Sequence, residues 1–101
     1  MQLKLGQALL VVTRGPNEGE ALSLQSDVTT VGRHPESDVF LYDRTVSRRH
    51  AEIHRQEGRF FIRDVGSLNG TYLNSRRVEG AELASGDELQ IGRYKLRFFS
   101  G

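Results

Sequence analysis

The sequence contains no cysteine, so neither a disulfide framework nor a thiolate metal site can form, and a reducing compartment is expected. Long apolar runs are missing as well. The run Leu9–Val12 is too short for a signal-peptide core or a membrane span, and Arg14 and Pro16 follow it instead of a cleavage site of small residues. The sequence therefore predicts a cytoplasmic protein with no membrane partner.

An excess of charge of one sign is also lacking. The 14 Lys and Arg residues nearly balance the 13 Asp and Glu residues, and a net charge of +1 gives no global reason to expect nucleic acid or an anionic membrane. Any anion site must therefore be built locally. Only Lys4 and Lys95 are lysines, and the other basic residues are arginines, whose planar fork of donors suits bidentate anion recognition.

Apolar residues recur at every second position over short stretches separated by turn-forming residues, which predicts strands and no helix. The expected strands are Ala8–Thr13, Ala21–Leu24, Thr29–Val31, Val39–Leu41, Ala51–Arg55, Phe60–Asp64, Thr71–Leu73, Arg76–Val78, Ala81–Leu83, Glu88–Ile91 and Tyr94–Phe99. A chain of 101 residues has room for one domain, predicted over residues 8–99 with residues 1–7 and 100–101 frayed. The pattern predicts an all-β sandwich with its loops at two ends.

Three segments between the expected strands carry polar residues suited to a phosphate group: Gly32-Arg33, Ser47-Arg48-Arg49-His50 and Ser67-Leu68-Asn69-Gly70-Thr71. A rigid scaffold can bring such loops together at one end. Guanidinium groups and serine hydroxyls donate hydrogen bonds to phosphate oxygens, and an asparagine amide can bond a peptide backbone. The motifs predict a binding site for a phosphorylated ligand.

Each motif also has an ordinary structural explanation. An arginine after a strand, such as Arg33, is usually a solvated surface residue, and Ser47-Arg48-Arg49 equally fits a basic run or a phosphorylation site. Asn69-Gly70 is a strong turn signal without any function. His50 directly precedes an apolar strand residue, so a packed histidine that bonds loop backbone is favoured over a catalytic one.

Catalysis and metal binding are disfavoured by spacing. Ser47, His50 and Asp43 lack a glycine-flanked nucleophile turn, and a base three residues along the same loop seldom meets the nucleophile correctly. The histidines, including His34 and His54, are scattered without the spacing of a ligand set. No enzyme activity, metal or cofactor is therefore expected.

Nucleic acid is the third class of ligand to weigh. Arg44, Arg48 and Arg49 form a basic patch, but aromatic side chains for base stacking do not alternate with them. With the small net charge, this disfavours a nucleic-acid partner.

With Gly32-Arg33, Ser47-x-x-His50 and Asn69-Gly70 in this order and spacing, the chain resembles the forkhead-associated (FHA) domain family from about Leu9 to Phe99. The resemblance implies an eleven-stranded, antiparallel-rich β-sandwich that binds phosphothreonine peptides through loops at one end. The longer strings around the motifs are similar to an actinobacterial group, the glycogen accumulation regulators and oxoglutarate dehydrogenase inhibitors. In that group a serine/threonine kinase phosphorylates a tail ahead of the domain, and the tail then folds into the domain's own site.

The resemblance also implies roles for individual residues. Arg33 would contact the phosphate and the neighbouring peptide backbone, and Ser47 would donate its hydroxyl to the phosphate. Arg48 would supply a further contact, and Asn69 would bond the peptide main chain. Architectural roles fall to three other motif residues, Gly32, His50 and Gly70.

The chain departs from the family pattern at Leu68, where a threonine often precedes the asparagine. A phosphate contact from a hydroxyl is therefore missing there, and Ser67 or a loop backbone N–H would have to supply it. Preference for flanking peptide residues is expected to come from side chains around the motifs, namely His34, Arg44, Asn74, Arg76 and Arg77.

The sequence thus predicts a non-catalytic phosphothreonine-peptide binding module in serine/threonine kinase signalling, acting as a monomer. Its expected partner is a phosphothreonine-containing protein, such as a serine/threonine kinase or a 2-oxoglutarate-using metabolic enzyme. The alternative is phosphorylation-independent docking to a metabolic enzyme, and its inhibition, through the same loop end. Titration with phosphorylated and unphosphorylated forms of one partner would separate the two.

Overall fold

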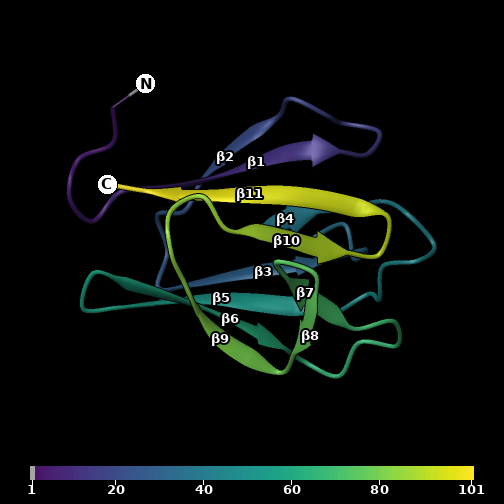
Figure 1. Ribbon diagram of the computed structural model, residues 1–101. Helices are drawn as coiled ribbons and strands as arrows, with labels where there is room; N and C mark the ends of the chain where they lie inside the picture. Colours follow the sequence, from purple (N-terminus) through teal and green to yellow (C-terminus); the bar gives the residue numbers. More distant parts are fainter. Residues whose placement is uncertain (1) are drawn as a thin grey trace.

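A computed structural model describes residues 2–101 and consists of strands joined by loops and turns (Figure 1). The eleven strands are β1 (Ala8–Arg14), β2 (Ala21–Ser23), β3 (Val28–Gly32), β4 (Val39–Phe40), β5 (Ala51–Gln56), β6 (Arg59–Asp64), β7 (Thr71–Leu73), β8 (Arg76–Val78), β9 (Gly80–Leu83), β10 (Glu88–Ile91) and β11 (Tyr94–Ser100). Every predicted strand is confirmed, with ends that shift by one residue at most. Among these residues, no helix is long and apolar enough to cross a membrane.

The strands form two sheets packed face to face. One sheet has the order β2-β1-β11-β10-β7-β8 and the other the order β4-β3-β5-β6-β9. Neighbouring strands are antiparallel except for β3 and β4, which pair in parallel through Val31–Val39 and Gly32–Phe40. The predicted antiparallel-rich β-sandwich is confirmed.

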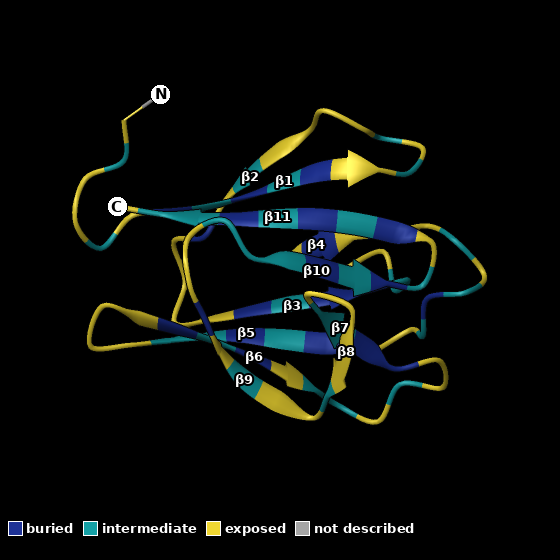
Figure 2. Ribbon diagram, in the orientation of Figure 1, coloured by how far each residue is buried: buried dark blue, intermediate teal, exposed yellow. Residues whose placement is uncertain are grey.

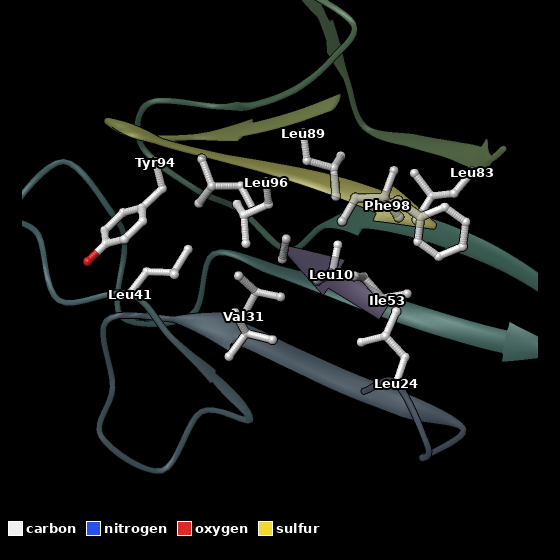
Figure 3. Packing of buried hydrophobic residues seen from close by; sticks show 14 of the residues in the cluster. Leu10, Leu24, Val31, Leu41, Ile53, Leu83, Leu89, Tyr94, Leu96 and Phe98 are labelled. Carbon is white, nitrogen blue, oxygen red and sulfur yellow. The ribbon is translucent and has the colours of Figure 1, made fainter. Parts of the chain in front are cut away.

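The core lies between the sheets because inward and outward side chains alternate along each strand. On β11, for example, Tyr94, Leu96 and Phe98 are buried while the residues between them are half-exposed. In Figure 3, Leu96 lies across from Val31 of β3 and Tyr94 lies beside Leu41, while Leu10 of the neighbouring strand β1 pairs with Phe98 in the same sheet. Figure 2 shows the same alternation as dark and lighter bands along the central strands, with the loops mostly exposed.

Strand register gathers the motif-bearing loops at one end of the sandwich. In the five-stranded sheet, Val31 pairs with Ala51, which pairs with Asp64, so β3 and β6 end where β5 begins. In the six-stranded sheet, Thr71 pairs with Ile91, beside the turn into β11. The connections that follow β3, β4, β6 and β10 therefore lie at the same end, on the right in Figure 1.

Both chain ends lie at the opposite end of the sandwich, on the left in Figure 1. Ala8 pairs with Ser100, and the Gly101 N–H donates a hydrogen bond of 3.0 Å to the Gln7 carbonyl. Ser100 belongs to β11, one residue beyond the predicted strand end. The domain bounds 8–99 and the fraying of residues 1–7 and 100–101 stay predictions, and Met1 lies outside the described residues.

Candidate functional site

Gly32 lets the loop between β4 and β5 (residues 41–50) lie directly on the end of β3. Two backbone hydrogen bonds hold it there, from the Arg33 N–H to the Ser47 carbonyl at 3.0 Å and from the His34 N–H to the Arg48 carbonyl at 3.2 Å. A Cβ atom at position 32 would run into the Arg48 carbonyl. Close approach of backbone is thus the reason for glycine, and it sets Arg33 beside Ser47.

Arg33 is half-buried, and its side chain is fixed by one bond to the loop. Its Nε–H donates to the Val46 carbonyl at 3.1 Å. Val46 is buried with 1% exposure, so the carbonyl that positions the guanidinium belongs to an anchored residue. Within residues 2–101 the two terminal nitrogens of Arg33 form no hydrogen bond or ion pair, so both remain available as donors to a ligand.

His50 joins two of the loops from inside the molecule, with 0% exposure. The Ser47 N–H donates to its Nδ1 at 3.0 Å, so Nδ1 carries no proton and Nε2–H donates to the Gly70 carbonyl at 2.8 Å. Burial lowers the pKa of His50, although the Gly70 carbonyl and the Asp64 charge oppose the shift. His50 is therefore a neutral crosslink with both ring nitrogens in use.

Asp64 organises the turn between β6 and β7. Its Oδ1 accepts from the N–H groups of Gly66 and Ser67, both at 2.9 Å, and its Oδ2 accepts from the hydroxyls of Ser67 and Thr71. Burial alone would raise the pKa of Asp64, but these donors outweigh it and lower the pKa to about 2. The carboxylate is thus saturated with protein donors and holds the turn in one shape.

Ser67 and Ser47 look alike in sequence but differ in what their hydroxyls do. The Ser67 hydroxyl donates to Asp64 and accepts from the Gly70 N–H at 2.9 Å, so its proton is committed within the turn. The Ser47 hydroxyl only accepts, from the Leu68 N–H at 3.0 Å. Its proton has no acceptor among residues 2–101 and can be donated to a ligand.

Asn69 and Leu68 lie exposed at the tip of the same turn. The Asn69 Nδ2 donates to the Thr45 carbonyl at 2.9 Å, which leaves the amide oxygen free of hydrogen bonds within the described chain. Leu68 is 84% exposed, an unusual position for a large apolar side chain. Gly70 has a φ of 89°, and a Cβ there would meet the guanidinium of Arg77, so Arg77 lies against this turn.

Thr45 connects the turn between β10 and β11 to the loop that carries Ser47. Its hydroxyl donates to Asp43 and accepts from the Arg93 N–H at 2.9 Å. Hydrogen bonds from Thr45 lower the pKa of Asp43, and the charges of Arg93 and Arg44 lower it further. Thr45, Asp64 and Arg93 were not among the site residues predicted from the sequence, although the two-residue turn Gly92-Arg93 between expected strands was a signal for Arg93.

Positive charge is concentrated at this end of the molecule despite the small net charge. Arg44, Arg48, Arg49 and Arg93 are exposed. The arginine ion pairs of the described residues involve Arg55, Arg59 and Arg97, none of which lies in these loops. No group of three or more His, Cys, Asp or Glu side chains within residues 2–101 could hold a metal ion. The chemistry on offer is donation of hydrogen bonds to an anion.

The structure brings together the predicted site residues by explicit contacts. Backbone bonds join Arg33 to Ser47, Leu68 donates to Ser47, and Asn69 donates to the loop that carries Ser47. Of the predicted flanking residues, His34 and Arg77 lie next to these loops, whereas the Asn74 side chain is bonded to Asp87 and Glu88.

A model of the FHA domain family matches residues 29–92. The chain is 57% identical over 99 residues to the glycogen accumulation regulator GarA of Mycolicibacterium smegmatis. The aligned segment covers 98% of this chain and 63% of GarA. The chain is also 57% identical over 96 residues to the oxoglutarate dehydrogenase inhibitor of Corynebacterium diphtheriae, covering 95% and 67%. The chain thus spans about three-fifths to two-thirds of the length of the curated relatives it matches.

Solved structures agree with this likeness. Mycobacterium tuberculosis EmbR in complex with a low-affinity phosphopeptide superposes with a TM-score of 0.86 and 28% identity, over 94% of this chain and 25% of that protein.

Proposed function

Because this chain belongs to the FHA domain family, we propose that it is a non-catalytic module that binds phosphothreonine peptides at the loop end of the sandwich. The observation that carries the proposal is the pair of unused donors on adjacent loops. The Ser47 hydroxyl proton and the terminal nitrogens of Arg33 have no acceptor within residues 2–101, and a backbone hydrogen bond holds the two residues together.

A phosphate group matches these donors in charge and geometry. It brings about −1.5 to −2 charges and three strong acceptor oxygens. Arg33 would present two N–H donors and Ser47 its hydroxyl, with Arg48 adding a second cation from the same loop. The positions are set before the ligand arrives, because the Val46 carbonyl, His50 and Gly32 fix the loop, so little ordering entropy would be lost on binding.

Asn69 and Leu68 would contact the peptide on either side of the phosphothreonine. Asn69 offers its free amide oxygen to a peptide N–H, and exposed Leu68 offers an apolar contact. The hydrogen bonds of Ser67 favour a supporting role for this residue over the phosphate contact that the sequence suggested.

The same bonds argue against catalysis. A general base needs a free nitrogen or carboxylate oxygen, but both ring nitrogens of His50 and both oxygens of Asp64 are occupied by partners inside the protein. Ser47 therefore has no base to deprotonate it among these groups, and the site would hold a phosphate without cleaving it.

The names of the relatives suggest where such a module acts. A regulator of glycogen accumulation and an inhibitor of oxoglutarate dehydrogenase, both at 57% identity, favour a phosphorylated metabolic enzyme as partner. A phosphothreonine ligand would place the module downstream of a serine/threonine kinase, which is a second candidate partner, and the lack of cysteine favours the cytoplasm. The inhibitor relatives also favour a second candidate function, phosphorylation-independent docking to a metabolic enzyme that uses 2-oxoglutarate, through the same loops.

A titration separates the two candidates. A phosphothreonine peptide selected from an oriented library should bind in calorimetry, and its dephosphorylated form should not. Arg33→Ala should lower affinity by about thirty-fold or more, since truncating one partner of a hydrogen-bonded charge pair costs about 2–5 kcal/mol. Arg63→Ala, an exposed arginine on β6, is the matched control. Equal affinity for both forms of the peptide would reject phosphothreonine recognition and favour docking.

A further inference from the structure

A concave surface lies between the β1–β2 loop (residues 15–20) and β4. We call it the acidic aromatic cleft, and its lining consists of Pro16, Asn17, Glu20, Leu22, Asp38, Phe40, Tyr42 and Tyr94. Its volume of about 480 Å³ lies within the ~300–1,000 Å³ typical of ligand sites. None of its residues belongs to the three phosphate-site motifs, but Tyr42 is the second residue of the loop that carries Ser47.

Two aromatic rings of the cleft are open to solvent. Phe40 is 41% exposed and Tyr42 is 73% exposed, and their ring centroids are 5.8 Å apart at an interplanar angle of 40°. Tyr94 is buried at the end of the core and faces Leu41 in Figure 3. A Cβ at Gly15 would collide with the Tyr94 ring, so the β1–β2 loop is packed against it and that wall of the cleft is fixed.

The charged groups of the cleft are all acidic. Asp38 Oδ2 accepts from the N–H and the hydroxyl of Thr30, and Glu20 Oε2 accepts from the Asn17 amide at 2.7 Å. Neither carboxylate forms an ion pair with any of residues 2–101. Burial raises the pKa of Tyr94, and the charges of Asp43 and Glu20 raise it further against a hydrogen bond with the Tyr42 backbone that lowers it.

The acceptors that a ligand can reach are the exposed carboxylates of Glu20 and Asp38. The Asn17 side chain supports one of them, because its amide nitrogen donates to Glu20 while its Oδ1 is buried. The cleft therefore combines acceptors and ring faces, and its lining contains no basic residue.

We propose that the acidic aromatic cleft binds an arginine side chain of the same protein whose phosphothreonine occupies the loop end. The inference rests on the proposed function. Arginine fits best because its guanidinium stacks on aromatic faces and its five N–H donors match the two exposed carboxylates. Since one loop connects the cleft to Ser47, a single ligand that carries a phosphate and an arginine can occupy both.

An arginine scan tests this directly. The parent probe is a library-selected phosphothreonine peptide with alanine flanks, and in each member of the series a single arginine occupies one flanking position. At one position or a short run of positions, arginine should raise affinity by about three- to ten-fold, as expected for one cation–π contact and one ion pair. Citrulline or norleucine at that position should lose most of the gain, because neither carries the charge.

Variants of the protein test whether the affinity gained from arginine comes from contacts in the cleft. Tyr42→Ala and Glu20→Gln should abolish the arginine gain and leave the affinity for the parent peptide within about two-fold. Phe61→Ala and Glu57→Gln, at residues outside the cleft lining, should change neither value. No gain at any position, a gain that persists in both cleft variants, or an equal gain with norleucine would overturn the inference. If the parent peptide fails to bind, the proposed function fails, and the shared-partner inference falls with it.

Discussion

Alanine substitution of the two loop serines should separate stability from recognition. Ser67→Ala removes a hydroxyl that donates to the Asp64 carboxylate and accepts from the Gly70 N–H. A hydrogen bond to a charged group contributes about 1.5–3 kcal/mol and a neutral one about 0.5–1.5 kcal/mol. Because the turn is partly exposed, we expect a loss near the lower end, about 2 kcal/mol in the free energy of unfolding. This lowers the melting temperature of a domain of this size by about 8–16 °C.

Ser47→Ala should behave in the opposite way. Its hydroxyl accepts one hydrogen bond, from the Leu68 N–H, so the melting temperature should fall by about 5 °C or less. Phosphopeptide affinity should fall about ten- to hundred-fold, because a donor to the phosphate is lost.

The assay is thermal melting together with peptide titration well below the melting point, with the exposed Ser26→Ala as control. If Ser67→Ala melts normally and loses as much affinity as Ser47→Ala, the Ser67 hydroxyl binds the ligand. That result would refute the structural role assigned to Ser67.

Three further outcomes are expected. Gly32→Ala should cost about 2 kcal/mol or more in calorimetric unfolding, because its Cβ meets the Arg48 carbonyl, whereas Gly80→Ala, whose Cβ would lie 3.6 Å from the Ile62 carbonyl, should melt nearly normally. Stability in urea should fall as the pH drops below about 6.5, because only the unfolded chain readily protonates His50. It should fall again from about 3.8 towards 2, and this second step should be smaller in Asp64→Asn, where Asp43 still contributes. Constant stability between pH 6.5 and 5 would contradict the first step. Arg33→Lys should recover only part of the affinity lost in Arg33→Ala, since a point charge cannot reproduce the fork, and full recovery in calorimetry would disprove bidentate contact.

The strands were predictable because alternation is a local property. Tyr94, Leu96 and Phe98 face one side wherever the strand lies in the sheet, so the sequence alone identifies β11. Even the two-residue strand β4 was found, since Val39 and Leu41 alternate with Phe40, although Leu41 stays buried just beyond the strand end. The resemblance to the FHA family then supplied what alternation cannot, the end of the sandwich at which a ligand is expected to bind.

The sequence did not predict which loop residues are bonded inside the protein and which are free to contact a ligand. Ser47 and Ser67 each follow small or branched residues in polar loops, and only the fold decides which hydroxyl meets Asp64. Arg93 was missed because its contact with Thr45 joins residues 48 positions apart in the chain. Contacts of this kind depend on strand register across both sheets, which no local pattern encodes.

Both chain ends lie opposite the motif-bearing loops, and this limits which attached segments can reach those loops. The long axis of the domain is 35 Å, and an extended chain covers about 3.3–3.6 Å per residue. A segment joined to either end would need about ten residues to reach the loops at all. Shorter linkers would leave the loops open to other molecules, and longer ones would let an attached segment compete for them at a local concentration that falls as the linker grows. Linker length could thus set how strongly an attached segment competes with other ligands for the loops, with no change in the contacts at the site.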